Sequence, residues 1–322
     1  HILKSFSPFN SEKLVFQVLP IISLFKDFDY LVVDGNLRHI SQAILSTLFK
    51  LFGKKMVVWS NVFTFGGNIH KQTLRLKWWK MFDHFLMYTE KDIVELHKIG
   101  FKSKNIISIN NGLNQNLISD EIKKWDNELL SNFKSKHNIN TENIIISSGR
   151  VNKVNEHELT LEAIKIVKNT IPDVLWVVIG NGSELEKLRH LIKTNDLIDN
   201  VLLLGEIYDE EKKCPWFLIS KAFIHSGPIG LSLFNAFGYS LPVVTHNETS
   251  YHGPEFSLFE DGKTGYLFEF RNSNDLALKI MDSIQNNEQV FEIRKNVFEI
   301  VNSKNNTDIM ASQFFKMIKS LQ

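Results

Sequence analysis

The chain has 322 residues, of which 43% are hydrophobic and 23% charged, an ordinary composition for a globular protein of a length that favours two domains over one. Its net charge of +1 argues against a protein that binds nucleic acid or another polyanion over its whole surface. The single cysteine, Cys214, excludes an intramolecular disulfide and fits a cytoplasmic protein, and no apolar run approaches the roughly 20 residues that span a bilayer.

The first part of the chain alternates short apolar segments with longer amphipathic ones, which is typical of βαβ units. The expected strands are 30–33, 55–59, 83–87 and 106–109. The expected helices are roughly 41–52 and 91–99, and a polar helical segment, about 120–137, leads into the next part.

The second part repeats this alternation. Its expected strands are 144–148, 175–179, 201–204, 222–225, 242–245 and 265–268. Its expected helices are 157–169, one that ends near 193, 231–239, 274–285, and a tail beyond 302. Together the two parts predict two doubly wound α/β domains, an N-terminal one over 1–135 and a C-terminal one over 136–305, followed by a helix over 306–322. In such sheets, ligands bind beyond the carboxyl ends of the strands.

Positive charge is concentrated near the start of the chain, where residues 1–130 carry 17 Lys and Arg against 12 Asp and Glu. This imbalance suggests an anionic partner such as a membrane surface or a lipid phosphate, and a chance imbalance is an equal alternative. The basic, aromatic segment 70–82 is the candidate for contact with an anionic membrane or a lipid-linked acceptor. The alternative is a helix with one packed face and one solvated basic face.

Several short motifs occur at the ends of the expected strands. In the second part they are Ser148-Gly149-Arg150, Ile179-Gly180-Asn181-Gly182, Leu204-Gly205, Gly230-Leu231-Ser232, Leu241-Pro242-Val243-Val244, Pro254-Glu255 and Asp261-Gly262-Lys263-Thr264-Gly265. Their order and spacing, over about 120 residues, resemble the C-terminal domain of family-4 glycosyltransferases. In the first part, Asn111-Gly112-Leu113-Asn114 resembles a loop of that family, and Asp34-Gly35-Asn36 and Val58-Trp59-Ser60 resemble its bacterial surface-polysaccharide subgroup.

The resemblance implies a GT-B fold, in which two Rossmann-like domains face a cleft and a C-terminal helix returns toward the first domain. It implies transfer of a sugar, with retention, from a UDP- or GDP-linked donor to a hydroxyl of a glycan or lipid-linked acceptor. The place would be the cytoplasm, with peripheral contact at the inner face of the membrane. The sequence has no His/Cys cluster, so neither a metal nor another cofactor is expected.

A sugar nucleotide carries a diphosphate, which requires cations and backbone donors. Arg150 follows a strand, and its forked guanidinium suits phosphate oxygens, with a surface salt bridge as the alternative. Amides of Gly230, Leu231 and Ser232 are candidates to cradle a phosphate, with a plain turn at Gly230 as the alternative. Lys153 is the second candidate cation.

The chain departs from the family at three positions. Asn155 stands where the family usually has a Lys, and Lys153 is close enough in sequence to replace it. Gly227 and Asn235 stand where the family often has two glutamates, which contact the donor sugar and the ribose. Gly227 has no side chain for that contact, whereas Asn235 is still able to bond a ribose hydroxyl.

The other donor-side candidates lie in neighbouring loops: Gly149, Asn155, Gly182, Gly205, Glu206, Ile207 and Glu255. Glu206 lies near the expected nucleobase contact and is equally well explained as a solvated side chain. Glu255 is equally well explained as a helix cap. The acceptor-side candidates are Asn36, His39 and Trp59, and a buried, structurally satisfied His39 is an equal alternative.

The resemblance also implies a first strand and a Gly-rich loop, but residues 1–29 contain no Gly. That element is therefore expected to be absent or replaced. The three departures at Asn155, Gly227 and Asn235 keep open a second function, a non-catalytic glycosyltransferase homologue that binds sugar or nucleotide or assists a partner enzyme. A smaller alternative is other sugar-nucleotide chemistry on the same fold, such as epimerisation.

Overall fold

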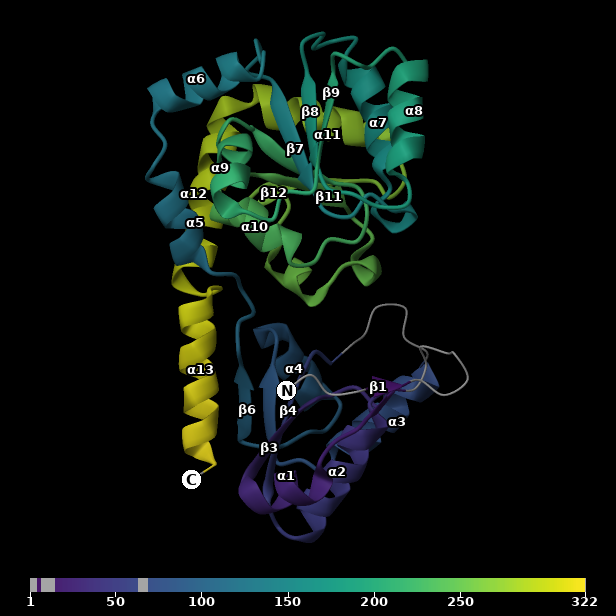
Figure 1. Ribbon diagram of the computed structural model, residues 1–322, viewed down its shortest axis with the longest axis vertical. Coiled ribbons are helices and arrows are strands. Elements are labelled where there is room, and N and C mark those ends of the chain that lie inside the picture. Colours follow the sequence, from purple (N-terminus) through teal and green to yellow (C-terminus); the bar gives the residue numbers. More distant parts are fainter. Residues whose placement is uncertain (1–4, 7–14, 63–68, 322) are drawn as a thin grey trace. The chain divides into compact units, whose positions relative to one another are not determined.

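The computed structural model describes residues 5–6, 15–62 and 69–321, which form two compact units (Figure 1). The first unit comprises the residues up to Asn111 and those from Asp308 onward, and the second comprises Gly112–Thr307. These divisions differ from the positions 135/136 and 305/306 expected from the sequence. Each unit contains its own parallel sheet, as two Rossmann-like domains require.

The first unit is built on a four-stranded parallel sheet in the order β3-β4-β5-β6. Its strands are β3 (Tyr30–Asp34), β4 (Lys55–Ser60), β5 (His84–Met87) and β6 (Asn105–Ser108). The helices of this unit are α1 (Ile21–Asp27), α2 (Ile40–Leu51), α3 (Ile69–Trp79), α4 (Glu90–Lys98) and α13 (Thr307–Ser320). An antiparallel pair, β1 (Ser5–Phe6) with β2 (Phe16–Gln17), precedes α1. The expected absence of a Gly-rich first loop remains a prediction, because much of that segment lies outside the described residues.

Apolar side chains cover both faces of this sheet. On one face, Val33, Met56 and Val58 pack against buried residues of α2, α3 and α4. On the other face, Val57 and Leu86 pack against α13, which contributes Met317 among others. The C-terminal helix thus returns to the first unit, as expected, because it supplies the apolar cover that one sheet face lacks.

Helix α3 contains most of the basic, aromatic segment. Trp78 and Trp79 are buried in the core, whereas Lys71, Lys77 and Lys80 are exposed. One face of the helix is therefore packed and the other is basic and solvated, as the alternative interpretation of this segment predicts. No helix among the described residues is both long enough and apolar enough to cross a membrane.

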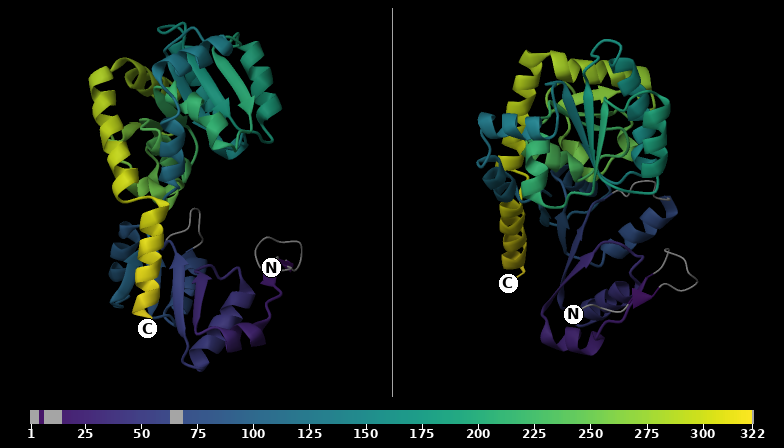
Figure 2. Two further views of the ribbon diagram at one scale, coloured as in Figure 1. Left: turned by 60° about the vertical axis from the view of Figure 1, so that its left-hand side comes forward. Right: turned by 45° about the horizontal axis from the view of Figure 1, so that its top comes forward.

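The second unit is built on a six-stranded parallel sheet in the order β12-β11-β10-β7-β8-β9. Its strands are β7 (Ile144–Ser148), β8 (Leu175–Ile179), β9 (Val201–Gly205), β10 (Ala222–His225), β11 (Val243–His246) and β12 (Gly265–Phe268). Most strand residues are buried on both sides, as in a sheet with helices on both faces (Figures 1 and 2).

Eight α-helices and three short 3₁₀ helices are described for the second unit. The α-helices are α5 (Gln115–Ile122), α6 (Asn127–Lys136), α7 (His157–Val167), α8 (Leu185–Thr194), α9 (Glu210–Leu218), α10 (Ser232–Gly238), α11 (Ser273–Gln285) and α12 (Asn287–Ser303). The 3₁₀ helices are η2 (Lys153–Asn155), η3 (Thr249–Tyr251) and η4 (Pro254–Leu258). Because α5 packs against α9 and α10, and α6 packs against α9, the segment expected as the end of the first domain belongs to the second.

Candidate functional site

The loops that follow β7, β8 and β9 are joined at their glycines. The Gly149 N–H donates to the Ile179 carbonyl (2.9 Å), and the Gly180 N–H donates to the Gly205 carbonyl (2.8 Å). A Cβ atom at Gly180 would lie 1.8 Å from the Gly149 carbonyl oxygen, and one at Gly182 would lie 2.2 Å from the Val151 oxygen. These contacts exclude any side chain at either position, so the backbone of both loops is brought close together at the carboxyl edge of the sheet.

Arg150 and Lys153 both project from the loop after β7 and are exposed. Within the described part of the chain, neither side chain makes an ion pair or a hydrogen bond, so the surface salt bridge considered for Arg150 is not formed there. The Asn155 amide donates to the Arg150 carbonyl (2.6 Å), and the Asn155 N–H donates to Asn152 Oδ1 (3.0 Å). Asn155 therefore holds the turn that presents the two cations.

The loop after β10 approaches the loop after β7 at Gly227. A Cβ atom at Gly227 would lie 2.4 Å from the Val154 carbonyl oxygen and 2.6 Å from the Asn155 Cα atom. A glutamate, as in many family members, does not fit at this position with these loops where they are. The loss of that carboxylate and the close approach of the two loops are thus a single structural feature.

Two histidines hold the same loop from either side. His225 Nε2 lies 3.2 Å from the Pro228 carbonyl, and the Ile229 N–H donates to His252 Nδ1 (3.1 Å). His252 Nε2 in turn donates to the His246 carbonyl (2.8 Å), which requires the neutral tautomer. Burial lowers the pKa of His225 to about 4 and also lowers the pKa of His252, so both rings are neutral at pH 7.

The residues after Ile229 offer backbone donors. Among the described residues, the N–H groups of Gly230, Leu231 and Ser232 find no acceptor, whereas the carbonyl groups of Gly230 and Leu231 accept bonds from α10. Glu255 is buried, and a Cβ atom at Gly230 would lie 3.7 Å from its Oε2. The N-cap of η4 is Gly253, and Glu255 lies in the first turn of that helix.

Asn235 lies on α10, in a polar cluster with α9. Its Oδ1 accepts from Lys213 Nζ (3.3 Å), and Lys213 forms an ion pair with Glu210 (2.8 Å). The Tyr239 hydroxyl also donates to Glu210. The Asn235 oxygen is therefore engaged within the protein, and its ribose contact remains a prediction.

The loop after β9 contains the candidates for a nucleobase contact. Gly205 has a φ of 74°, Glu206 is exposed, and Ile207 packs against the core. Tyr208 is 86% exposed, which is unusual for so large a ring, and sequence reasoning did not single it out. In the sequence, the signal for Tyr208 was its position directly after the donor-side candidate Ile207.

A further residue that the sequence did not reveal is His157, at the start of α7. It stacks against Trp176 with ring centroids 6.1 Å apart, its Nδ1 is buried without a partner in the described structure, and burial lowers its pKa to about 4. It lines a cavity of about 10 Å³ with Ser148, Asn155 and Ser226. That volume approaches what one water molecule needs.

The acceptor-side candidates lie in the first unit. Asn36 Oδ1 accepts the Arg38 N–H (3.1 Å), so this side chain organises the turn after β3. His39 Nε2 lies 3.2 Å from an Asp34 carboxylate oxygen, and its Nδ1 is buried without a partner in the described structure, so the ring is only partly satisfied. Trp59 packs against Phe314 of α13, with ring centroids 6.1 Å apart.

A family model described as glycosyl transferases group 1 matches residues 131–299, just over half of the chain. The chain belongs to the group 1 glycosyl transferases. The matched region begins in α6 and includes all six strands of the second unit, with every donor-side candidate residue. The predicted GT-B architecture of two Rossmann-like domains is confirmed.

This glycosyltransferase is similar to several named proteins, two of them from bacteria. It is 27% identical over 195 residues to a poly(ribitol-phosphate) alpha-N-acetylglucosaminyltransferase of Staphylococcus aureus, covering 59% of this chain and 39% of that protein. It is 25% identical over 268 residues to an uncharacterized glycosyltransferase of Haemophilus influenzae, covering 81% of this chain and 67% of that one. The chain thus spans well under half of the first relative and about two thirds of the second.

Among solved structures, the fold is similar to that of Anabaena HepE in complex with UDP, with a TM-score of 0.73 at 14% sequence identity. The similarity covers 93% of this chain and 80% of HepE. At 14% sequence identity, this similarity shows a shared fold and nothing more.

Proposed function

We propose that this group 1 glycosyltransferase is a retaining enzyme of the family-4 type. It moves a sugar from a nucleoside-diphosphate sugar to a hydroxyl of a glycan or lipid-linked acceptor in polysaccharide synthesis. The observation that carries the proposal is that two cations and three amides, all without partners among the described residues, lie on neighbouring loops. The loop of Arg150 and Lys153 touches the loop that leads to Gly230 through the Gly227–Asn155 contact. A diphosphate needs this combination of groups.

In this mechanism the protein acts by charge stabilisation. The bond between the anomeric carbon and the phosphate oxygen breaks, the acceptor oxygen bonds to the same face, and its proton passes to the departing phosphate. Arg150 and Lys153 offset the charge that develops on the diphosphate, and the amides of Gly230 to Ser232 hold it in position. No metal is required in this proposal.

The relatives support the choice of substrate class. HepE was solved with UDP, and the S. aureus relative transfers N-acetylglucosamine to poly(ribitol phosphate), as its name states. A UDP-linked sugar is therefore the first donor to test, with a GDP-linked sugar second. In this proposal Tyr208 and Ile207 contact the base, and Asn235 or its neighbours contact the ribose. The reaction would take place in the cytoplasm, beside an anionic membrane surface.

The proposal is tested by turnover of a panel of UDP and GDP sugars, with and without bacterial glycan acceptors. Loss of a charge-assisted phosphate contact costs about 1.5–3 kcal/mol, so Arg150→Ala should lower kcat/KM by about tenfold to a hundredfold. Arg189→Ala, an exposed arginine on α8 paired with Glu186, is the matched control and should have no effect. Donor binding without turnover would favour the non-catalytic homologue.

A further inference from the structure

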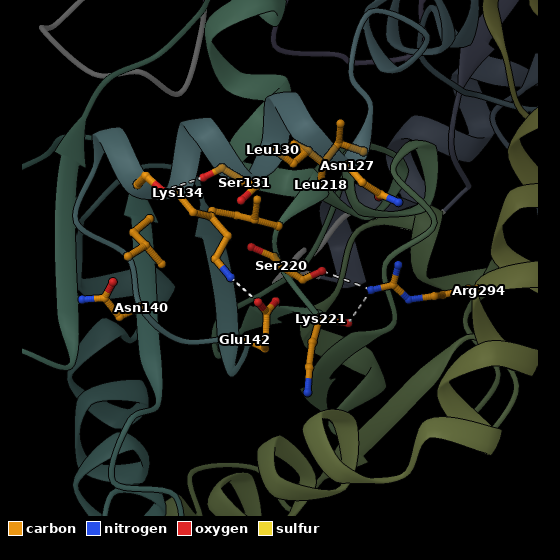
Figure 3. Close-up of a pocket in the computed structure, with 13 residues that line it drawn as sticks. Asn127, Leu130, Ser131, Lys134, Asn140, Glu142, Leu218, Ser220, Lys221 and Arg294 are labelled. Atoms are coloured by element: carbon orange, nitrogen blue, oxygen red, sulfur yellow. Dashed lines mark hydrogen bonds and ion pairs between the residues drawn. The ribbon is translucent and has the colours of Figure 1, made fainter.

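A second cavity of about 580 Å³ lies in the same unit, at the opposite edge of the sheet (Figure 3). It is bounded by α6, by the residues before β7, by the residues between α9 and β10, and by Arg294 of α12. Its volume is in the range of small-molecule sites. The candidate donor loops follow the carboxyl ends of these strands, whereas this cavity adjoins their amino ends, so the two are separate sites.

Arg294 is the main charged group of this cavity. One guanidinium nitrogen donates to the carbonyls of Ser220 (3.1 Å) and Lys221 (3.3 Å), which fixes the side chain across the cavity wall (Figure 3). Both partners are neutral, and among the described residues no carboxylate pairs with Arg294. Burial accordingly lowers its pKa, and within the described structure no acidic group raises it. A half-buried guanidinium without a counter-ion favours an anion beside it.

The rest of the wall supplies hydrogen-bonding groups. Lys134 is paired with Glu142, so that this pair adds no net charge. Lys221 Nζ bonds Asn143 Oδ1 (3.3 Å) and the Ile284 carbonyl (3.2 Å), and its charge also acts on nearby Asp173. Neutral polar side chains, including Asn127, Ser131 and Asn140, line the remaining wall above a smaller apolar part. Such a wall suits a ligand rich in hydroxyl groups.

We propose that this cavity binds a sugar that carries an anionic group, with the phosphate or carboxylate on Arg294 and the hydroxyls on the polar wall. The free guanidinium nitrogens supply the fork that a phosphate or carboxylate accepts. The ligand is either a sugar phosphate or a sugar acid, and it binds independently of the donor loops.

Calorimetric titration of the full chain tests the proposal, with glucose 6-phosphate, glucuronate, glucose and inorganic phosphate as probes. The informative variant is Asn127→Asp. Asn127 is exposed at the first position of α6, where an aspartate is favourable for the helix, so folding should be unaffected while a carboxylate enters the cavity. Asn132→Asp adds the same charge to the same helix outside the cavity and is the matched control.

Glucose 6-phosphate, glucuronate or both should bind saturably, and more tightly than glucose or phosphate alone. Binding should weaken about tenfold in Asn127→Asp, persist in Asn132→Asp, and persist in Arg150→Ala, which disables only the donor loops. Any one of four results would overturn the proposal. Two concern the variants: equal binding to Asn127→Asp, or loss of binding in Arg150→Ala. Two concern the probes: phosphate binding as tightly as the sugar anions, or no binding of either sugar anion. None of these outcomes bears on donor turnover.

Discussion

Glu156 and Arg271 form an ion pair although both have a left-handed backbone. Arg271 Nε lies 3.1 Å from Glu156 Oε1, and the φ angles are 49° for Glu156 and 59° for Arg271. Residues other than Gly rarely adopt this backbone conformation, which costs them roughly 1–2 kcal/mol. The pair joins the loop of Arg150 to the turn between β12 and α11, so a contact between the two strained positions offsets part of their cost.

The first prediction concerns this pair. Glu156→Ala keeps the strain and loses the ion pair, whereas Glu156→Gly loses the ion pair and relieves the strain. Because Arg271 is exposed, the ion pair contributes less to the free energy of unfolding than the strain of the left-handed backbone does. We therefore expect Glu156→Gly to unfold with a free energy about 1 kcal/mol higher than Glu156→Ala, measured by urea denaturation. Equal stabilities would show that the left-handed backbone stores no strain.

The second prediction separates two glycines of one loop. A Cβ atom at Gly227 would overlap the backbone of Val154 and Asn155, whereas at Gly230 its nearest neighbour would be Glu255 Oε2 at 3.7 Å. Gly227→Ala should therefore lower the free energy of unfolding by about 1–3 kcal/mol and weaken donor binding. Gly230→Ala should leave stability nearly unchanged. Equal free energies of unfolding for the two variants in denaturant would contradict the close approach of the two loops.

The third prediction is a loss of stability in acid. Burial lowers the pKa of His157 and His225 to about 4 and that of His246 to about 3, from an ordinary 6.5. Between pH 6.5 and about 4 the unfolded chain therefore binds protons that the folded chain does not, and stability falls as pH falls. Each histidine contributes up to about 1.4 kcal/mol per pH unit.

Denaturation at a series of pH values checks this. The His157→Phe variant retains the ring stack on Trp176. It should reduce the slope of the free energy of unfolding against pH by about the contribution of one histidine. His190→Gln, at an exposed position on α8, is the control and should leave the slope unchanged. A flat profile between pH 6.5 and 4 would contradict the buried, neutral state of these rings.

The fourth prediction concerns α3. Each exposed lysine near an anionic bilayer contributes about 1 kcal/mol to binding. Replacing Lys71, Lys77 and Lys80 by Glu should therefore abolish cosedimentation with vesicles that contain anionic lipid, while leaving the unfolding free energy nearly unchanged, because these side chains are solvated. Neutral vesicles provide the control. Unaltered binding to anionic vesicles would remove α3 as the membrane contact.

Much of the second unit was predictable from local pattern. The expected bounds of β7, β8, β10 and β12 agree with the structure, and the apolar runs of β7, β8 and β10 end at Ser or Gly. Two helices were missed. Helix α9 has Pro215 inside it and a charged first turn, and α12 follows α11 after the single residue Asn286, so neither shows a clear start in the sequence.

The candidate site was predictable only in part. Arg150 and the segment Gly230–Ser232 stand at strand ends, where a parallel sheet brings ligand contacts together. The support for that segment was not predictable, because His252 bonds Ile229 from 23 positions away and Glu156 meets Arg271 across 115. Hydrogen bonds between such distant residues leave no local periodicity.

By itself, the sequence determined the two parallel sheets and the loops that carry chemistry, since apolar periodicity and turn residues act within a few neighbouring positions. Only the tertiary structure decided that Gly227 has no room for a side chain, that Asn155 orders the Arg150 turn, and that Arg294 lacks a carboxylate partner in the described structure. These properties depend on which backbones approach one another after folding, and a packed interior sets that distance to within a fraction of an ångström.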